Sequence, residues 1–132
     1  MVRKRLLDPK RMRNLPRSYS WVDHRLMRDR FLHTLDVYEA ALYFFLVLVG
    51  DHQGLSYYSD GTACRTLSME YEQMHRSRLG LIRKSLIAYE PPLYQVLELP
   101  AGPVQVYTPS RSGNTALGEV LQGLARKGGA QA

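Results

Sequence analysis

Hydrophobic positions between residues 36 and 99 repeat first with helical and then with strand spacing. Asp36 and Glu39 have the spacing of a capping box, with Asp in place of the usual Ser or Thr, so we expect a helix to begin there. The next residues are apolar almost all round, which predicts the central helix of the core, ending near Gly50 and Gly54. Its inward side is predicted to consist of Val37, Ala40, Ala41, Phe44, Phe45 and Leu48.

After this helix the pattern predicts a short strand and two helices separated by a tight turn. Residues 55–58 form a short segment with two tyrosines, as is typical of a strand. Ser59 or Asp60 is placed to cap a helix that runs to about Leu67, and Ser68 to cap the next one, expected over residues 69–86. The inward positions of this second helix are predicted to be Met74, Leu81, Ile82 and Leu86.

Two short strands, residues 86–90 and 93–99, are predicted next, joined by Pro91-Pro92. Prolines suit a connection because they cannot donate a hydrogen bond within a sheet. The order helix, strand, helix, turn, helix, hairpin is that of a winged helix-turn-helix. We therefore expect a mainly α fold with a small β-hairpin wing (α+β), a class that most often places its last helix in a DNA major groove.

The flanking segments divide the chain into three predicted parts. Residues 1–17 mix basic residues with two prolines and are expected to form a basic flexible arm. Residues 18–108 form the winged-helix domain, which includes a short amphipathic helix from about residue 23 and a third strand at 104–107. Residues 109–132 are predicted to be a linker and a weak C-terminal helix that two glycines interrupt, with apolar positions at Leu117, Val120, Leu121 and Leu124.

Charge is distributed unevenly along the chain. Residues 1–30 contain ten Lys or Arg against three Asp, a net charge of +7, whereas residues 31–132 contain eight against nine Asp or Glu, a net charge of −1. A basic arm of this kind binds phosphates and releases their counterions without reading sequence. The alternatives are a solubilising tail and a contact with an acidic protein surface. The expected DNA-backbone contacts of the arm are Arg3, Lys4, Arg5, Lys10, Arg11, Arg13 and Arg17.

The predicted helix over 69–86 carries the candidates for DNA recognition. Gln73 and Arg76 lie early in it and are expected to contact bases, because Gln pairs with adenine and Arg with guanine. Glu70 and Glu72 favour the helix start but would meet phosphates, so the same helix is equally suited to docking a protein. The candidates for backbone contact in the body are Arg65, Arg78, Arg83 and Lys84.

Other features narrow the class of protein. The longest apolar run, residues 40–49, is too short to span a bilayer, and no signal-like segment follows the basic N-terminus, so we expect a cytoplasmic protein without a membrane partner. The single cysteine, Cys64, excludes an internal disulfide. The four histidines are scattered, and no phosphate-binding loop or nucleophile motif occurs, so we expect no enzymatic activity, no metal and no cofactor.

Several short motifs add a resemblance to this interpretation. They are Tyr19-Ser20-Trp21-Val22, Ala41-Leu42-Tyr43, Asp51-His52-Gln53-Gly54-Leu55, Leu86-Ile87-Ala88-Tyr89 and Pro91-Pro92-Leu93-Tyr94-Gln95-Val96-Leu97. Over residues 19–99 the chain resembles small winged-helix proteins of bacterial mobile elements and plasmids, with the helix-turn-helix module of replication-initiator and DnaD-like proteins. The resemblance implies double-stranded DNA binding in transcriptional control, replication or transposition, often as a homodimer, near the nucleoid and without a cofactor. The remaining alternative is an adaptor subunit of a larger nucleoprotein assembly, whose winged helix docks protein.

Overall fold

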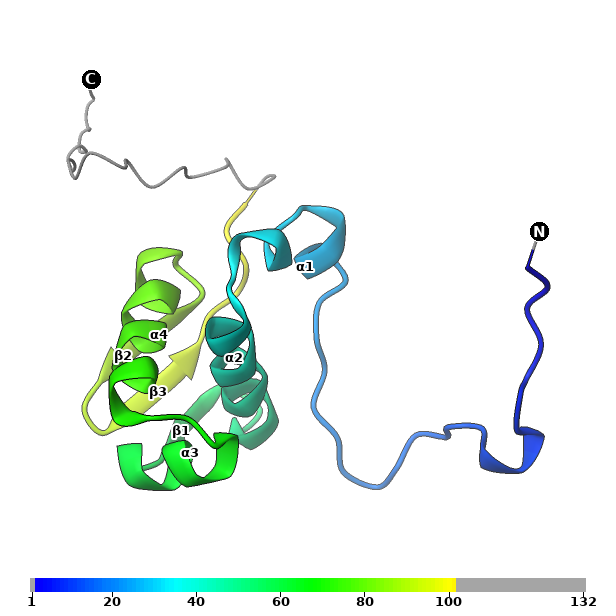
Figure 1. Cartoon of the computed structure of the whole chain (residues 1–132), viewed down its shortest axis with the longest axis horizontal. Coiled ribbons are helices and arrows are strands. Elements are labelled where there is room, and N and C mark those ends of the chain that lie inside the picture. Colours follow the sequence, from blue (N-terminus) through cyan, green and yellow to red (C-terminus); the bar gives the residue numbers. More distant parts are fainter. Residues whose placement is uncertain (1, 102–132) are drawn as a thin grey trace, which may run out of the picture.

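The computed structural model describes residues 2–101, which form an α+β arrangement of four α-helices and a small antiparallel sheet (Figure 1). The helices are α1 (Arg25–Arg28), α2 (Val37–Val49), α3 (Asp60–Leu67) and α4 (Tyr71–Arg83), with 3-10 helices η1 (Pro9–Arg11) and η2 (Leu32–Thr34). The strands are β1 (Leu55–Tyr57), β2 (Ile87–Glu90) and β3 (Leu93–Val96). The strand predicted at 104–107 and the helix and linker predicted over 109–132 lie outside the described residues.

Helix α2 begins at the predicted capping box. The Glu39 backbone N–H donates to Asp36 Oδ1 at 2.8 Å, and the Asp36 N–H donates to Glu39 Oε1 at 3.0 Å, which confirms this start. The predicted inward side is wrong in part, because Phe44 is 60% exposed, and Val37 and Leu48 are exposed as well. Because α2 is apolar on all sides, the spacing of its hydrophobic residues does not identify which side is buried. In the structure α4 and the sheet pack on the side of Leu42, Phe45 and Leu46.

The turn between α3 and α4 differs from the predicted one. Ser59 caps α3 as predicted, because its Oγ accepts from the Thr62 N–H at 3.1 Å. Ser68 does not cap α4; it ends α3 in a left-handed conformation with φ of 53°. Helix α4 therefore begins after Glu70 and is shorter than the predicted 69–86.

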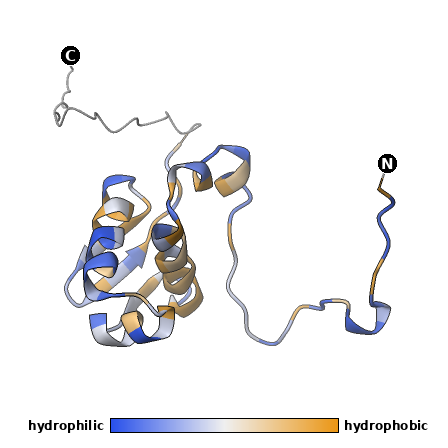
Figure 2. Cartoon of the chain, in the orientation of Figure 1, coloured by the Kyte–Doolittle hydropathy of each residue, from blue (hydrophilic) through white to orange (hydrophobic). Residues whose placement is uncertain are grey.

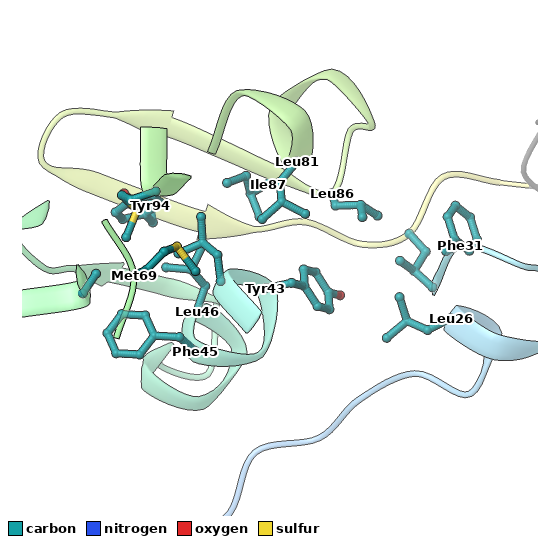
Figure 3. Close-up of a cluster of buried hydrophobic side chains, with 14 residues drawn as sticks. Leu26, Phe31, Tyr43, Phe45, Leu46, Met69, Leu81, Leu86, Ile87 and Tyr94 are labelled. Atoms are coloured by element: carbon teal, nitrogen blue, oxygen red, sulfur yellow. The ribbon is translucent and has the colours of Figure 1, made fainter. Parts of the chain in front are cut away.

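The inward side of α4 largely follows the prediction. Met74, Leu81 and Leu86 are fully buried, whereas Ile82 is 36% exposed and was wrongly assigned to the core. Figure 3 shows Leu81 and Leu86 in one cluster with Tyr43 and Leu46 of α2, Ile87 of β2 and Tyr94 of β3, and Leu26 and Phe31 extend this cluster. Leu26 lies in α1 and Phe31 directly precedes η2, so the helix predicted from residue 23 is divided, with Arg30 at a φ of 68° between the two pieces.

The sheet has the strand order β1-β3-β2 and contains the predicted hairpin, with Pro91-Pro92 between β2 and β3. Strand β1 pairs with β3, with Ser56 opposite Tyr94. Gly54 precedes β1 at a φ of 83°, and a Cβ there would lie 2.7 Å from the Val96 carbonyl oxygen, so only glycine fits where this turn meets the sheet. The order of elements is compatible with a winged helix.

Residues 2–18 are exposed and lead away from the folded body (Figure 1). Their one helical turn is η1, where the Lys10 N–H donates to Asp8 Oδ1 at 3.2 Å. The mobility of this arm stays a prediction. Within residues 2–101 no helix is long and apolar enough to cross a membrane.

Candidate nucleic-acid interface

Helices α3 and α4 are joined by residues 68–70 and pack against each other and against α2. The side of α4 with Met74, Ser77 and Leu81 is buried in the body, which leaves the opposite side to solvent. We call this opposite side the outer face of α4. It consists of Tyr71, Glu72, His75, Arg76, Leu79, Ile82 and Arg83.

The two predicted base-contacting residues lie in different environments. Arg76 is exposed on the outer face of α4. Gln73 is only partly exposed, and its Oε1 accepts a hydrogen bond from the Glu70 backbone N–H at 3.0 Å, so its amide caps the helix. A paired contact with adenine requires that same oxygen as an acceptor for the base. Arg76 is therefore the better placed of the two.

An aromatic pair on the outer face was not singled out from the sequence. The rings of Tyr71 and His75 stack with centroids 6.3 Å apart and planes 15° apart. His75 Nδ1 lies 3.3 Å from Arg78 Nη2, a contact in which the guanidinium can only donate. The i, i+4 spacing of the two residues was the signal available in the sequence. The outer face of α4 thus carries a stacked pair of flat rings as well as Arg76.

Arg78 is a correction to the predicted backbone contacts. It is 5% exposed, and its Nη1 donates to Asp60 Oδ1 at 2.7 Å and to the Tyr94 hydroxyl at 2.8 Å. Its guanidinium also lies over the Tyr89 ring, 4.4 Å from the centroid. Arg78 thus ties α4 to the start of α3 and to both strands of the hairpin, and it does not reach a phosphate.

The charge state of this cluster is fixed by its contacts. Burial lowers the pKa of the Arg78 guanidinium, but its hydrogen bonds with Asp60 and Tyr94 outweigh burial and raise that pKa above the ordinary value. For the neutral Tyr94 phenol burial has the opposite effect and raises the pKa above its ordinary value, although the hydrogen bond from Arg78 opposes the shift. Arg78 is therefore a permanent cation whose charge is used inside the protein.

Lys84 is the second correction. Its Nζ lies 2.7 Å from Glu39 Oε1 and donates to the Thr34 carbonyl oxygen at 2.8 Å. The Glu39 side chain is only 11% exposed and also caps α2. The sequence analysis made Lys84 a candidate for DNA-backbone contact because its partner lies 45 residues away along the chain. Lys84 joins the end of α4 to the start of α2.

The other predicted backbone contacts remain exposed. Arg65 on α3 and Arg83 at the end of α4 are both exposed. So are all seven cations of the arm, Arg3, Lys4, Arg5, Lys10, Arg11, Arg13 and Arg17. Glu70 and Glu72 are exposed at the start of α4, where their negative charge would repel a phosphate. Positive charge available to a ligand is thus concentrated in the arm.

Among residues 2–101 no group of three or more His, Cys, Asp or Glu side chains is placed to hold a metal ion. Comparisons of the chain with protein-family models, with curated proteins and with solved structures gave no match. The functional assignment rests on the geometry of the outer face of α4 and of the arm.

Proposed function

We propose that this protein is a non-enzymatic DNA-binding protein of the winged helix-turn-helix class, acting as a transcriptional regulator or as a replication or transposition accessory factor of a mobile element. The observation that carries the proposal is the pairing of a fully exposed arm with seven cations and a helix, α4, whose outer face is open. The arm supplies phosphate affinity, and α4 supplies orientation and sequence preference.

The arrangement of α3 and α4 supports this class. Their connection of residues 68–70 has the length of a helix-turn-helix turn, and the β2–β3 hairpin follows α4 in the position of a wing. In that geometry the second helix enters the major groove with its early residues near the base edges. Arg76 then contacts a base, and Arg65 and Arg83 contact the backbone on either side.

The distribution of exposed cations supports a larger share of the affinity for the arm than for the body. Of the eight Lys or Arg between residues 18 and 101, three are paired with carboxylates, namely Arg25, Arg78 and Lys84. The other five are exposed and are Arg28, Arg30, Arg65, Arg76 and Arg83. Each cation that neutralises a phosphate releases counterions, so affinity rises with the number of such contacts. We infer that the arm binds any duplex and that α4 selects among duplexes.

Selection from a pool of random duplexes tests this division. We expect the full chain to enrich a sequence motif, Arg76→Ala to relax the preference at one base position, and the matched variant Arg83→Ala to weaken binding equally on all sequences. A mismatch at a well-read position costs about 1 to 3 kcal/mol, which such a selection resolves readily. Equal losses on every sequence for Arg76→Ala would remove this residue from base reading.

The acidic start of α4 favours a second candidate function. Glu70 and Glu72 are exposed beside Tyr71, a combination better suited to a protein surface than to phosphates. In this alternative the protein is an adaptor subunit whose α4 docks a partner protein while the arm contacts nucleic acid. It predicts that the full chain enriches no sequence and that binding disappears when the arm cations are replaced by Gln. Sequence-selective binding by a monomer would contradict it.

A further inference from the structure

Helix α2 exposes a row of apolar side chains, which we call the apolar stripe of α2. Its members are Val37, Ala41, Phe44 and Leu48. Val37 is 80% exposed, Phe44 60% and Leu48 56%, and Ala41 between them is partly exposed. Their steps of four, three and four residues place them within about 60° of one another around the helix axis. Figure 2 shows α2 coloured as hydrophobic along most of its length, in contrast to α3 and α4.

The spacing of the stripe is that of a contact between two helices. Alternating steps of four and three residues form the pattern by which paired helices pack their side chains into each other. The opposite side of α2 packs on α4 and the sheet, and Glu39, the one charged residue of α2, is turned inward to Lys84. The stripe therefore has the form of a second helix contact of α2, and no helix among residues 2–101 covers it.

A groove between α1 and α2 widens this surface on one side of the stripe. Phe44 belongs to both, and the exposed Met27 and Leu32 line the groove from α1 and η2. The lining also carries charges of both signs, because it includes Asp23 and Arg28. The stripe and the groove together thus form an uncharged centre with charged groups beside it.

The size of this surface is sufficient for a specific contact. Its exposed large apolar residues are Val22, Met27, Leu32, Val37, Phe44 and Leu48. At on the order of 100 Å² each they offer about 600 Å², which is at the upper limit of the apolar patches that monomers leave open. Each partner in a standard protein interface buries about 800 Å². A partner that covers the stripe and the groove would therefore form an interface of about ordinary size.

The stripe is complementary to itself when a second copy lies antiparallel to it. With a two-fold axis midway between Ala41 and Phe44, each Phe44 faces the Ala41 of the other copy, and each Val37 faces its Leu48. A large ring then meets a methyl group, which lets the two helices pack closely. A parallel pair would place Phe44 on Phe44 and Ala41 on Ala41, and would crowd one level while leaving a gap at the other.

The charges beside the stripe suit the same symmetry. A two-fold contact repeats each pairing with the two copies exchanged. A surface that carries both Asp23 and Arg28 therefore offers each copy an acid for the base of the other. Contact between identical surfaces with charge of only one sign would instead be repulsive.

We propose that a second copy of this chain covers the apolar stripe, in a two-fold dimer whose α2 helices pack antiparallel with Phe44 on Ala41. The preceding segment leaves the stripe accessible, because Ser20 Oγ donates to the Leu48 carbonyl oxygen at 3.3 Å while Leu48 stays 56% exposed. The contact uses the side of α2 opposite to α4, so the outer face of α4 and the arm remain open. The proposal does not depend on DNA binding.

Sedimentation equilibrium of the full chain tests the dimer, in about 0.5 M salt to screen contacts of the arm. We expect a mass of about twice the 15.1 kDa of the chain. Phe44→Asp should raise the dissociation constant about thirtyfold or more, because it places a charge at the centre of the contact. The matched control Leu79→Asp, on the outer face of α4, should change it by less than about twofold. A monomer at every concentration, or a dimer that Phe44→Asp leaves intact while circular dichroism shows a folded chain, would overturn the proposal.

Disulfide exchange tests the orientation and does not require Phe44→Asp to fold. With Cys64→Ala as background, equal amounts of the Val37→Cys and Leu48→Cys proteins are mixed in a glutathione redox buffer, and the dimers are identified by their intact masses. We expect the mixed disulfide well above the half that random pairing gives, since the antiparallel contact brings these two positions together. Two copies of Val37 would lie about 16 Å apart along the axis, whereas a disulfide requires Cα atoms within about 7 Å. A random mixture, or a majority of disulfides between identical proteins, would overturn the antiparallel dimer.

Discussion

In the arm, Arg3 and its six companion cations are exposed along a segment that leads away from the rest of the molecule, whereas in the folded body Arg78 and Lys84 point inward to Asp60 and Glu39. The two regions contain the same residue types. Arginine in the arm keeps its hydration and is available to a polyanion, while Arg78 directs its donors to the carboxylate and hydroxyl around it and stacks on a ring.

This difference teaches that the position of a cation in the fold decides its function. Residues 1–17 contain seven Lys or Arg against one Asp, a net charge of +6, whereas residues 18–132 contain eleven Lys or Arg against eleven Asp or Glu, so charge already separates the regions. The internal pairing of Arg78 and Lys84 separates them further, because it removes two cations from the surface of the body. Two cations of the body thus make internal ion pairs, whereas the cations of the arm are exposed to solvent.

Replacing Arg78 should give the largest effect. Arg78→Met keeps the length of the side chain but leaves Asp60 and the Tyr94 hydroxyl without their partner, so we expect a loss of about 2 to 4 kcal/mol in the free energy of unfolding. The matched variant Arg76→Met on the outer face should change it by less than about 0.5 kcal/mol. Urea denaturation measures both. Similar values for the two variants would mean that the body does not depend on its internal cation.

Replacing Lys84 should destabilise the body less than replacing Arg78. Lys84→Met leaves the largely buried Glu39 carboxylate with its capping hydrogen bond but without a counter-charge, and we expect a loss of about 1 to 2 kcal/mol. Arg83→Met, its neighbour in the sequence, should cost less than about 0.5 kcal/mol because Arg83 is exposed. A greater loss for Arg83→Met in the same denaturation experiment would show that the ion pair of Lys84 is not structural.

The smallest expected effect comes from the backbone conformation of Ser85. Ser85 has a φ of 61°, a conformation that costs any residue with a Cβ, so Ser85→Gly should stabilise the body by about 0.5 to 1 kcal/mol. Ser18→Gly at the end of the arm should leave stability unchanged, because that segment adds little to the cooperative fold. The midpoint of urea unfolding measures both, and destabilisation by Ser85→Gly would contradict this interpretation.

Local signals in the sequence predicted the fold better than the site. The capping box of Asp36 and Glu39, the cap at Ser59 and the prolines of the hairpin act within a few residues, and each is confirmed. The predicted cap at Ser68 is wrong: a serine before a helix normally caps that helix, whereas Ser68 ends α3, and its backbone N–H donates to the Cys64 carbonyl oxygen.

Contacts between residues far apart in the chain could not be predicted from the sequence. Arg78 meets Asp60 across 18 residues and Lys84 meets Glu39 across 45, and neither spacing marks a pair before the fold is known. On α2, apolar residues lie on all sides, so periodicity did not distinguish the buried Leu42 from the exposed Phe44. Arg76 is exposed, as its predicted contact with a base requires. Contact of Arg76 with a base stays a prediction.

The salt dependence of DNA binding tests the central claim most directly. The affinity for one duplex is measured across a salt series for the full chain and for a variant in which all seven arm cations are replaced by Gln, after urea unfolding has shown equal stability. We predict that the slope of log affinity against log salt becomes shallower by up to about six, close to 0.9 for each phosphate that the arm no longer neutralises. An unchanged slope would contradict the claim, because it would place the phosphate-binding cations on the body and leave the exposed arm without a function in binding.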